Sequence, residues 1–123
     1  MNSSIERRFY VREKRLQRVY EIEEDLYNYL KYASKKYRGT ISDLFNFCIR
    51  ELVETKKFRV CEFREKVLYQ GCSFDVDESN IRALNELKDK TRYTLVTLVS
   101  MAIRNVMDEE DWVGWEDWQP EEK

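Results

Sequence analysis

An internal repeat is the feature that most constrains how this chain folds. The segment TISDLFNFCIRELV at residues 40–53 has a counterpart 54 positions later, TLVTLVSMAIRNVM at residues 94–107. At this offset the chain aligns with itself without a gap from about Arg18 to Met107. A fixed period of this kind indicates two copies of one supersecondary unit. The identical pairs include Glu24/Glu78, Leu30/Leu84, Lys36/Lys90, Arg38/Arg92, Thr40/Thr94, Leu44/Leu98, Ile49/Ile103 and Arg50/Arg104.

Each copy begins with a short run that alternates in polarity. Alternation with period two predicts a strand with one buried face, and Arg18 is the imperfection on the apolar side. The expected inward residues are Leu16, Tyr20 and Ile22 in the first copy and Cys72, Phe74 and Val76 in the second.

Two helices follow the alternating run in each copy. The first opens on acidic residues, as the helix dipole favours, in EEDLYNYLKYASKKY and DESNIRALNELKDKT. In the second of these, Asn80 stands where a leucine is expected. The second helix carries a broad apolar stripe at three-and-four spacing, with Thr40 or Ser42, and Thr94, as candidate caps.

A chain of 123 residues suits one compact unit or two very small ones. A module of about 45 residues rarely buries enough apolar area alone, so we expect the two copies to complete one another's core. The predicted boundaries are a basic arm (1–15), a first unit (16–57), a connector (58–70), a second unit (71–107) and an acidic tail (108–123). The connector is too apolar for a loose linker and either continues the helix or adds a strand. Strand pairing within one chain and between two chains both remain open.

Composition argues against an enzyme or a metal protein. The chain has no histidine, no glycine-rich phosphate loop and no GxSxG motif, so we expect no catalytic site, no cofactor, no metal and no small-molecule substrate. Cys48, Cys61 and Cys72 form neither a disulfide framework nor a CxxC metal site, which fits a reducing cytoplasm. No apolar run reaches the length of a membrane span, and the first residues lack a signal-peptide core.

Charge is unevenly distributed along the chain. Residues 1–104 hold 21 Lys and Arg against 16 Asp and Glu, a net +5, whereas residues 105–123 hold one Lys against eight acids, a net −7. Basic and acidic ends suggest different partners. The basic arm is either a solvated segment or a contact for phosphates or the minor groove. Its cationic residues are Arg7, Arg8, Arg12, Lys14 and Arg15.

The order strand, helix, turn, helix resembles the ribbon–helix–helix fold of the MetJ/Arc superfamily of DNA-binding regulators. The segments that carry the resemblance are VYEIEEDLYNYLKYASKKYRGTISDLFNFCIREL and SFDVDESNIRALNELKDKTRYTLVTLVSMAIRNV, about two thirds of the chain. Two copies in one chain are most similar to the tandem regulators of archaeal viruses, which would place the protein in a host cytoplasm. The resemblance implies a mainly α fold with a short antiparallel ribbon and an intrachain pseudo-dimer.

The resemblance also implies how such a chain would bind double-stranded DNA. In the family a two-stranded ribbon enters the major groove, where outward side chains meet base edges. The corresponding positions here are Gln17, Val19, Glu21, Gly71, Ser73 and Asp75. Glu21 and Asp75 depart from the family, which more often has basic or neutral residues there. Self-association on an operator with short repeats is a further family trait.

The family holds DNA phosphates at the start of the second helix, where free amides and the helix dipole favour an anion. An arginine precedes that helix in both copies. The matching residues are Arg38, Gly39, Thr40, Ile41, Arg92, Tyr93, Thr94 and Leu95.

The acidic tail contains Trp112, Trp115 and Trp118, which recur every three residues. Exposed together they would be unusual without a partner, so they either fold back on their own domain or bind another protein. The leading hypothesis is a sequence-specific transcriptional regulator, as a repressor and possible activator. The alternatives are an antitoxin-like module that binds a protein through this tail, and an assembly protein.

Overall fold

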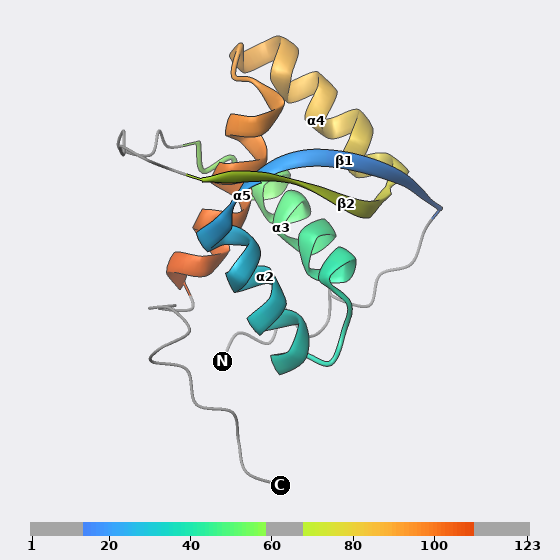
Figure 1. The fold of residues 1–123 in the computed structure, drawn as a ribbon. Coiled ribbons are helices and arrows are strands. Elements are labelled where there is room, and N and C mark those ends of the chain that lie inside the picture. Colours follow the sequence, from blue (N-terminus) through green and yellow to red (C-terminus); the bar gives the residue numbers. More distant parts are fainter. Residues whose placement is uncertain (1–13, 59–67, 110–123) are drawn as a thin grey trace, which may run out of the picture.

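The structure, a computed structural model, describes residues 14–58 and 68–109. It is mainly helical with one two-stranded antiparallel sheet, as predicted. The strand and the second helix of the second unit each lie 54 residues after their counterparts in the first unit. The elements form two units in chain order: β1 (Arg15–Glu23), α2 (Glu24–Lys36) and α3 (Ile41–Thr55), then β2 (Tyr69–Asp77), α4 (Glu78–Thr91) and α5 (Leu95–Glu109) (Figure 1).

The ribbon pairs β1 with β2 inside one chain. Its register runs from Arg15 opposite Asp77 to Glu23 opposite Tyr69, with Val19 opposite Ser73 at the middle. The strands extend beyond the alternating residues from which they were predicted, because the pairing reaches the last residue before each helix, Glu23 and Asp77. Tyr69 and Gln70, which the sequence analysis assigned to the connector, open β2.

Contacts cross between the two units. Helix α3 packs against β2 and α5 packs against β1, while α3 and α5 also pack against each other. The backbone repeats this exchange: the Glu24 N–H donates to the Leu68 carbonyl at 2.9 Å, and the Glu78 N–H donates to the Lys14 carbonyl at 3.0 Å. In Figure 1 the ribbon crosses the middle of the molecule, with α2 on one side and α4 on the other. Each helix pair is thus completed by the strand of the other unit.

One continuous core draws on both units. Alternation in the strands turns Tyr20 and Phe74 inward, where both rings meet Phe45 of α3. The Phe45 ring stacks on Phe74 with centroids 4.2 Å apart and on Tyr20 with centroids 5.4 Å apart. The predicted apolar stripe of the second helices is confirmed as core. Its fully or nearly fully buried residues are Leu44, Phe45, Cys48, Ile49, Leu52, Leu98, Val99, Ala102, Ile103, Val106 and Met107.

Local signals account for the helix ends. Thr40 caps α3 through a capping box, in which the Asp43 N–H donates to Thr40 Oγ1 and the Thr40 N–H donates to Asp43 Oδ2, both at 3.0 Å. Thr94 caps α5 through one such bond, in which its Oγ1 accepts from the Thr97 N–H at 3.1 Å. At its other end α3 stops at Lys56, whose φ of 54° is left-handed. The connector therefore does not continue this helix.

Within the described ranges, Cys48 and Cys72 are buried, and burial raises the pKa of the Cys72 thiol. No helix among the described residues is long and apolar enough to cross a membrane.

Truncating the ring at the centre of the core is expected to destabilise the fold strongly. Phe45→Ala removes the stacking contacts with Tyr20 and Phe74 and leaves a cavity between α3 and the ribbon. The free energy of unfolding should fall by about 3–5 kcal/mol. Urea denaturation followed by circular dichroism measures it. Phe58→Ala is the control, since Phe58 is only partly buried at the edge of the core, and it should cost clearly less. Equal losses from the two variants would contradict this account of the core.

Candidate nucleic-acid interface

The solvent side of the ribbon is a strip formed by every second side chain of each strand. All six positions that the sequence analysis assigned to base contact are exposed, and Val19 at the centre is 67% exposed. They face one another across the strands in three rungs: Gln17 with Asp75, Val19 with Ser73, and Glu21 with Gly71. We call these six residues the outer face. Their exposure confirms the predicted direction of the side chains, whereas contact with DNA stays a prediction.

Two neighbours modify the outer face. Tyr69 is 50% exposed and lies two residues before Gly71, so it extends the same side of β2. Tyr69 was not predicted as part of the strand, because the alternation in the second copy is clear only from Gly71 onward. Arg18 was expected on the apolar side, but it is exposed and its Nη1 donates to the Gln17 carbonyl at 2.8 Å. Its guanidinium therefore lies at the ribbon surface beside the outer face.

Gly71 leaves an open place on the outer face. A Cβ built at this glycine would lie 3.7 Å from Val19 Cγ1, which is ordinary van der Waals contact. Side chains are therefore tolerated at position 71. Glu21 stands opposite this gap.

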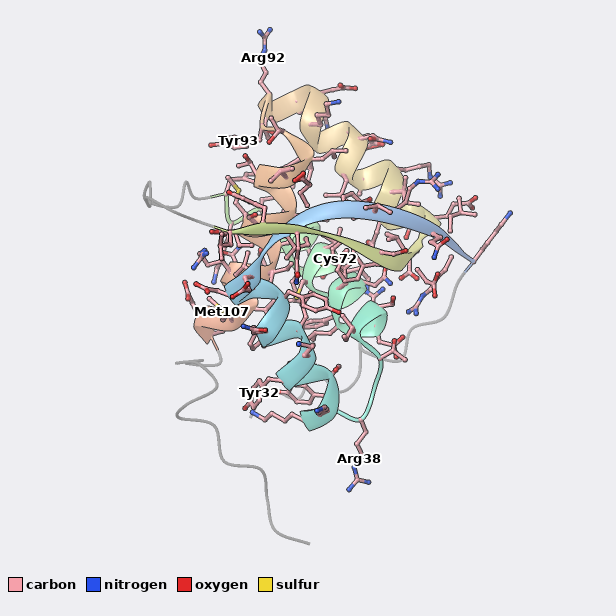
Figure 2. The ribbon with its side chains drawn as sticks, viewed as in Figure 1. Tyr32, Arg38, Cys72, Arg92, Tyr93 and Met107 are labelled. Atoms are coloured by element: carbon pink, nitrogen blue, oxygen red, sulfur yellow. The ribbon has the colours of Figure 1, made fainter. Side chains whose placement is uncertain are left out.

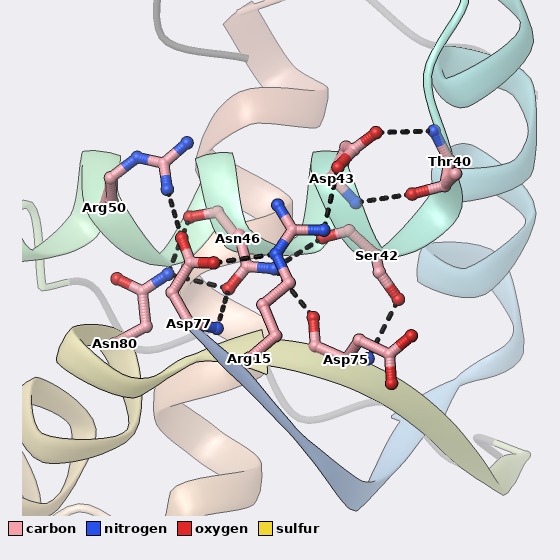
Figure 3. A network of polar contacts seen from close by, with 9 residues as sticks. All are labelled: Arg15, Thr40, Ser42, Asp43, Asn46, Arg50, Asp75, Asp77 and Asn80. Atoms are coloured by element: carbon pink, nitrogen blue, oxygen red, sulfur yellow. Dashed lines mark hydrogen bonds and ion pairs between the residues drawn. The ribbon is translucent and has the colours of Figure 1, made fainter. Parts of the chain in front are cut away.

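The outer face carries negative charge. Within the described part of the chain, no hydrogen bond or ion pair holds the carboxylates of Glu21 and Asp75, and both side chains are exposed. In Figure 3 the Asp75 carboxylate points away from the surrounding polar contacts. A carboxylate can accept a hydrogen bond from cytosine N4, but it is repelled by phosphates. The carboxylates of the outer face therefore do not themselves attract DNA phosphates, and cations beside the ribbon would have to supply any such attraction.

Two arginines stand at the turns between the helices. Arg38 and Arg92 are exposed, and both adopt left-handed backbone angles, with φ of 60° and 67°. The turns are closed by local hydrogen bonds, from the Gly39 N–H to the Ser34 carbonyl at 2.9 Å and from the Arg92 N–H to the Lys88 carbonyl at 3.0 Å. Figure 2 shows the two side chains extending from opposite ends of the molecule, with the ribbon between them.

The remaining residues of the predicted phosphate sites divide into two kinds. Thr40 and Thr94 are exposed caps, so the first turns of α3 and α5 lie close to the surface. Ile41, Tyr93 and Leu95 are partly buried against the core. The side chains of these three residues therefore position the helix starts. The backbone N–H groups of Ile41 and Leu95 are suited to an anion, whereas the Tyr93 N–H donates to Thr91 Oγ1 at 3.2 Å.

A buried carboxylate fixes one end of the ribbon. Asp77, at the end of β2, has no solvent exposure and accepts from Arg15 Nε at 2.8 Å and from Arg50 Nη1 at 2.6 Å (Figure 3). A buried charge requires such partners, because an unpaired one is very costly. The related pair at the other end joins Arg104 Nη2 to Glu23 Oε2 at 2.9 Å. In both pairs the arginine of one unit holds the strand end of the other.

Amide side chains extend this contact under the ribbon. Asn46 of α3 accepts from the Asp77 N–H at 2.7 Å and donates to the Asp75 carbonyl at 2.9 Å. Asn80 of α4 donates to Asn46 Oδ1 at 2.9 Å. The Asp75 N–H donates to Ser42 Oγ at 2.9 Å. Asn80, unexpected on an apolar stripe, is therefore a satisfied buried polar group.

Arg15 is placed differently from the prediction. It was assigned to the basic arm, but it is the first residue of β1 and is partly buried. Besides Asp77, its guanidinium binds Asp43 Oδ1 at 2.8 Å. The Arg15 guanidinium is therefore paired with two carboxylates of the protein. Lys14, also assigned to the arm, is exposed.

Asp43 is held in its ionised form. Burial opposes ionisation, but the Thr40 N–H and the Arg15 guanidinium outweigh it and leave the pKa of Asp43 below its ordinary value. The capping box and the end of the ribbon are thus coupled through one carboxylate.

Other predicted residues lie outside the described part of the chain. These are Arg7, Arg8 and Arg12 of the arm and Trp112, Trp115 and Trp118 of the tail. Among residues 14–58 and 68–109, no group of three His, Cys, Asp or Glu could hold a metal ion. Comparison with known proteins gave no match to any family model, curated protein or solved structure.

Removing the Asp43 charge should make the free energy of unfolding depend less on pH in the acid range. Because the folded-state pKa of Asp43 is lowered, its contribution is complete above the ordinary carboxyl range and is lost as the pH falls through the folded-state value. Asp43→Asn should therefore lower stability at neutral pH by about 1 kcal/mol. The difference from the parent protein should shrink toward low pH.

Urea denaturation at a series of pH values measures this difference. Asp89→Asn on the exposed surface of α4 is the control, and its difference curve should stay near zero. A difference for Asp43→Asn that is constant with pH would contradict the assignment.

Proposed function

We propose that this protein is a sequence-specific regulator of transcription that binds double-stranded DNA by inserting its ribbon into the major groove. One observation carries the proposal: an antiparallel two-stranded ribbon presents six exposed, alternating side chains, and an arginine-bearing helix start lies on either side of it. The major groove of B-DNA admits a two-stranded ribbon of this kind. The expected fold of the ribbon–helix–helix class supports the same reading.

The proposed DNA-binding body is an intrachain pseudo-dimer. Counterpart elements pack on opposite strands, α3 on β2 and α5 on β1, and counterpart arginines bind opposite strand ends. Val19 and Ser73, which are counterparts in the repeat, face each other at the middle of the register. An axis through this rung would relate the two units as the axis of a homodimer relates two chains.

The outer face offers the chemistry for reading bases. Gln17 can form a two-point contact with adenine, Val19 can touch a thymine methyl, and the carboxylates can accept from cytosine N4. Each good contact of this kind discriminates against the wrong base by about 1–3 kcal/mol. Because the outer face is itself acidic, specific contacts here depend on phosphate contacts elsewhere to bring the ribbon into the groove.

Arg38 and Arg92 are the proposed phosphate contacts. Left-handed backbone angles favour glycine, and an arginine in this region is disfavoured by about 1–2 kcal/mol. Both units nevertheless have an exposed arginine in this conformation directly before the capped start of the second helix. A cation beside free helix amides is suited to a phosphate oxygen. The strained backbone is thereby linked to binding.

The proposed biological action follows from occupancy of DNA. A protein that covers an operator blocks transcription from it, so repression is the simplest outcome. Several copies bound side by side would occupy an operator with repeated sites. The cytoplasm, of a host cell if the source is viral, is the proposed location.

The arginine turns allow binding to be separated from stability. The double variant Arg38→Gly, Arg92→Gly should leave the free energy of unfolding unchanged or raise it by up to about 1 kcal/mol, because glycine is unstrained at these angles. Affinity for DNA should fall about ten-fold for each lost contact. The slope of log K against log salt should become shallower by about 1.8, since two phosphates are no longer neutralised. Fluorescence anisotropy with a duplex at several salt concentrations measures both quantities.

Lys56→Gly is the matched control for this experiment. Lys56 also has a positive φ and an exposed cationic side chain, but it lies at the opposite end of α3 from Thr40. This variant should change the free energy of unfolding by as much as either single variant, Arg38→Gly or Arg92→Gly, and should bind DNA as the parent protein does. If the three single variants weaken binding equally, general charge and not a phosphate site is responsible. A parent protein that binds no duplex even in dilute buffer would refute the proposed function.

A further inference from the structure

We propose that the DNA site read by one chain is asymmetric, a sequence of two unlike halves and not a palindrome. This inference rests on the proposed function. It names the kind of DNA that the outer face is built to recognise.

The backbone of the ribbon is symmetric about its middle rung. Val19 and Ser73 lie opposite each other and are counterparts in the repeat, so the rungs on either side exchange under a two-fold rotation. The rung of Gln17 and Asp75 becomes the rung of Gly71 and Glu21. A homodimer with this geometry would present equal ends and would match a palindromic site.

The side chains of the outer face break this symmetry. Gln17 has Gly71 as its counterpart, so one end presents a long amide and the other presents no side chain. At the centre Val19, apolar and 67% exposed, has Ser73 as its counterpart, which is an exposed hydroxyl. Glu21 and Asp75 agree only in charge. Every symmetry-related pair on the outer face therefore differs in size or chemistry.

The two ends consequently suit different bases. At the first end the Gln17 amide lies beside the Asp75 carboxylate, a combination that offers two donors and several acceptors to base edges. At the second end the longer Glu21 stands opposite the Gly71 gap, with only a carboxylate to accept hydrogen bonds. Adenine fits the first arrangement through its N6 and N7, and cytosine fits the second through N4.

Contacts under the ribbon ensure that it contains one strand of each kind. Asn46 of α3 is buried and binds Asn80 of the second unit. In a ribbon assembled from two first units, the counterpart of Asn80 would be Leu26, and the Asn46 amide would lose that partner inside the core. Arg15, which joins Asp77 to Asp43, has Tyr69 as its counterpart. Two second units would therefore lack this link.

The supports of the outer face are unequal as well. The start of α3 is tied to the first end of the ribbon, because Ser42 accepts from the Asp75 N–H and Asn46 donates to the Asp75 carbonyl. The counterparts of Ser42 and Asn46 are Val96, which has no hydroxyl, and Ser100. The rung of Gln17 and Asp75 is thus held by side chains that its symmetry-related rung does not have.

Selection of bound duplexes from a random pool tests the proposal with the full-length protein. The expected result is an enriched sequence without inverted-repeat symmetry. Where two copies bind, the same sequence should recur as a direct repeat. Replacing one half of the selected duplex by the reverse complement of the other half should weaken binding about ten-fold or more, the effect of one lost two-point contact.

A symmetrised variant provides the matched comparison. The triple substitution Gly71→Gln, Ser73→Val, Asp75→Glu gives β2 the outer residues of β1, all at exposed positions where a side chain at 71 is tolerated. Its selected sequence should be a palindrome. The reciprocal variant Gln17→Gly, Val19→Ser, Glu21→Asp should also select a palindrome, of different sequence, and serves if the first variant does not fold by circular dichroism.

The outcomes separate the two proposals. A palindrome selected by the parent protein overturns the asymmetric site but leaves DNA binding intact. An asymmetric sequence that persists in both folded variants also overturns the inference, because the asymmetry would then come from outside the outer face. Failure of the parent protein to enrich any sequence or to bind any duplex refutes the proposed function itself.

Discussion

The structure depends on the exchange of packing partners between its two units. Each pair of helices packs against both strands: α3 lies on β2 and α5 lies on β1, while α2 contacts β1 and α4 contacts β2. The Phe45 ring shows the consequence at atomic scale, since it stacks on an aromatic residue from each strand. Burial of apolar area, the main term that favours folding, is therefore complete only when both units are present. The paired strands hold the helices together, and the helices in turn hold the ribbon out to solvent.

Buried polar contacts between the two units favour this pairing of β1 with β2 over alternative pairings. The buried carboxylate of Asp77 is satisfied by two guanidinium groups, while Glu23 at the other end has Arg104. Buried ion pairs contribute little net stability on average, but removal of one partner is costly, so they discriminate among alternative pairings. The Asn46 and Asn80 amides act in the same direction. The fold is thus nearly symmetric in its backbone and distinctly asymmetric in its polar contacts.

Much of this arrangement was predictable from sequence, because an offset of 54 residues and the periods of the apolar positions report burial directly. The strand faces, the helix stripes and the caps at Thr40 and Thr94 follow from local patterns. The full length of the ribbon did not, since Tyr69 and Gln70 follow an apolar connector with no signal of where pairing begins. Arg15 was misassigned because a charge run looks the same whether its last member is solvated or bound. Its partners lie 28 and 62 residues away along the chain, and no local pattern reports such contacts.

Covalent linkage of the two units makes strand pairing independent of the concentration of the protein. A DNA-binding homodimer dissociates and loses its folded form when its concentration falls below the dimerisation constant. Here strand pairing is intramolecular. The units are joined by the residues between the end of α3 at Thr55 and the start of β2 at Tyr69, so this tether sets the effective concentration of one strand near the other. The ribbon is therefore assembled in the first molecule synthesised. Joining the units also favours pairing within one chain over pairing with a strand of a related chain.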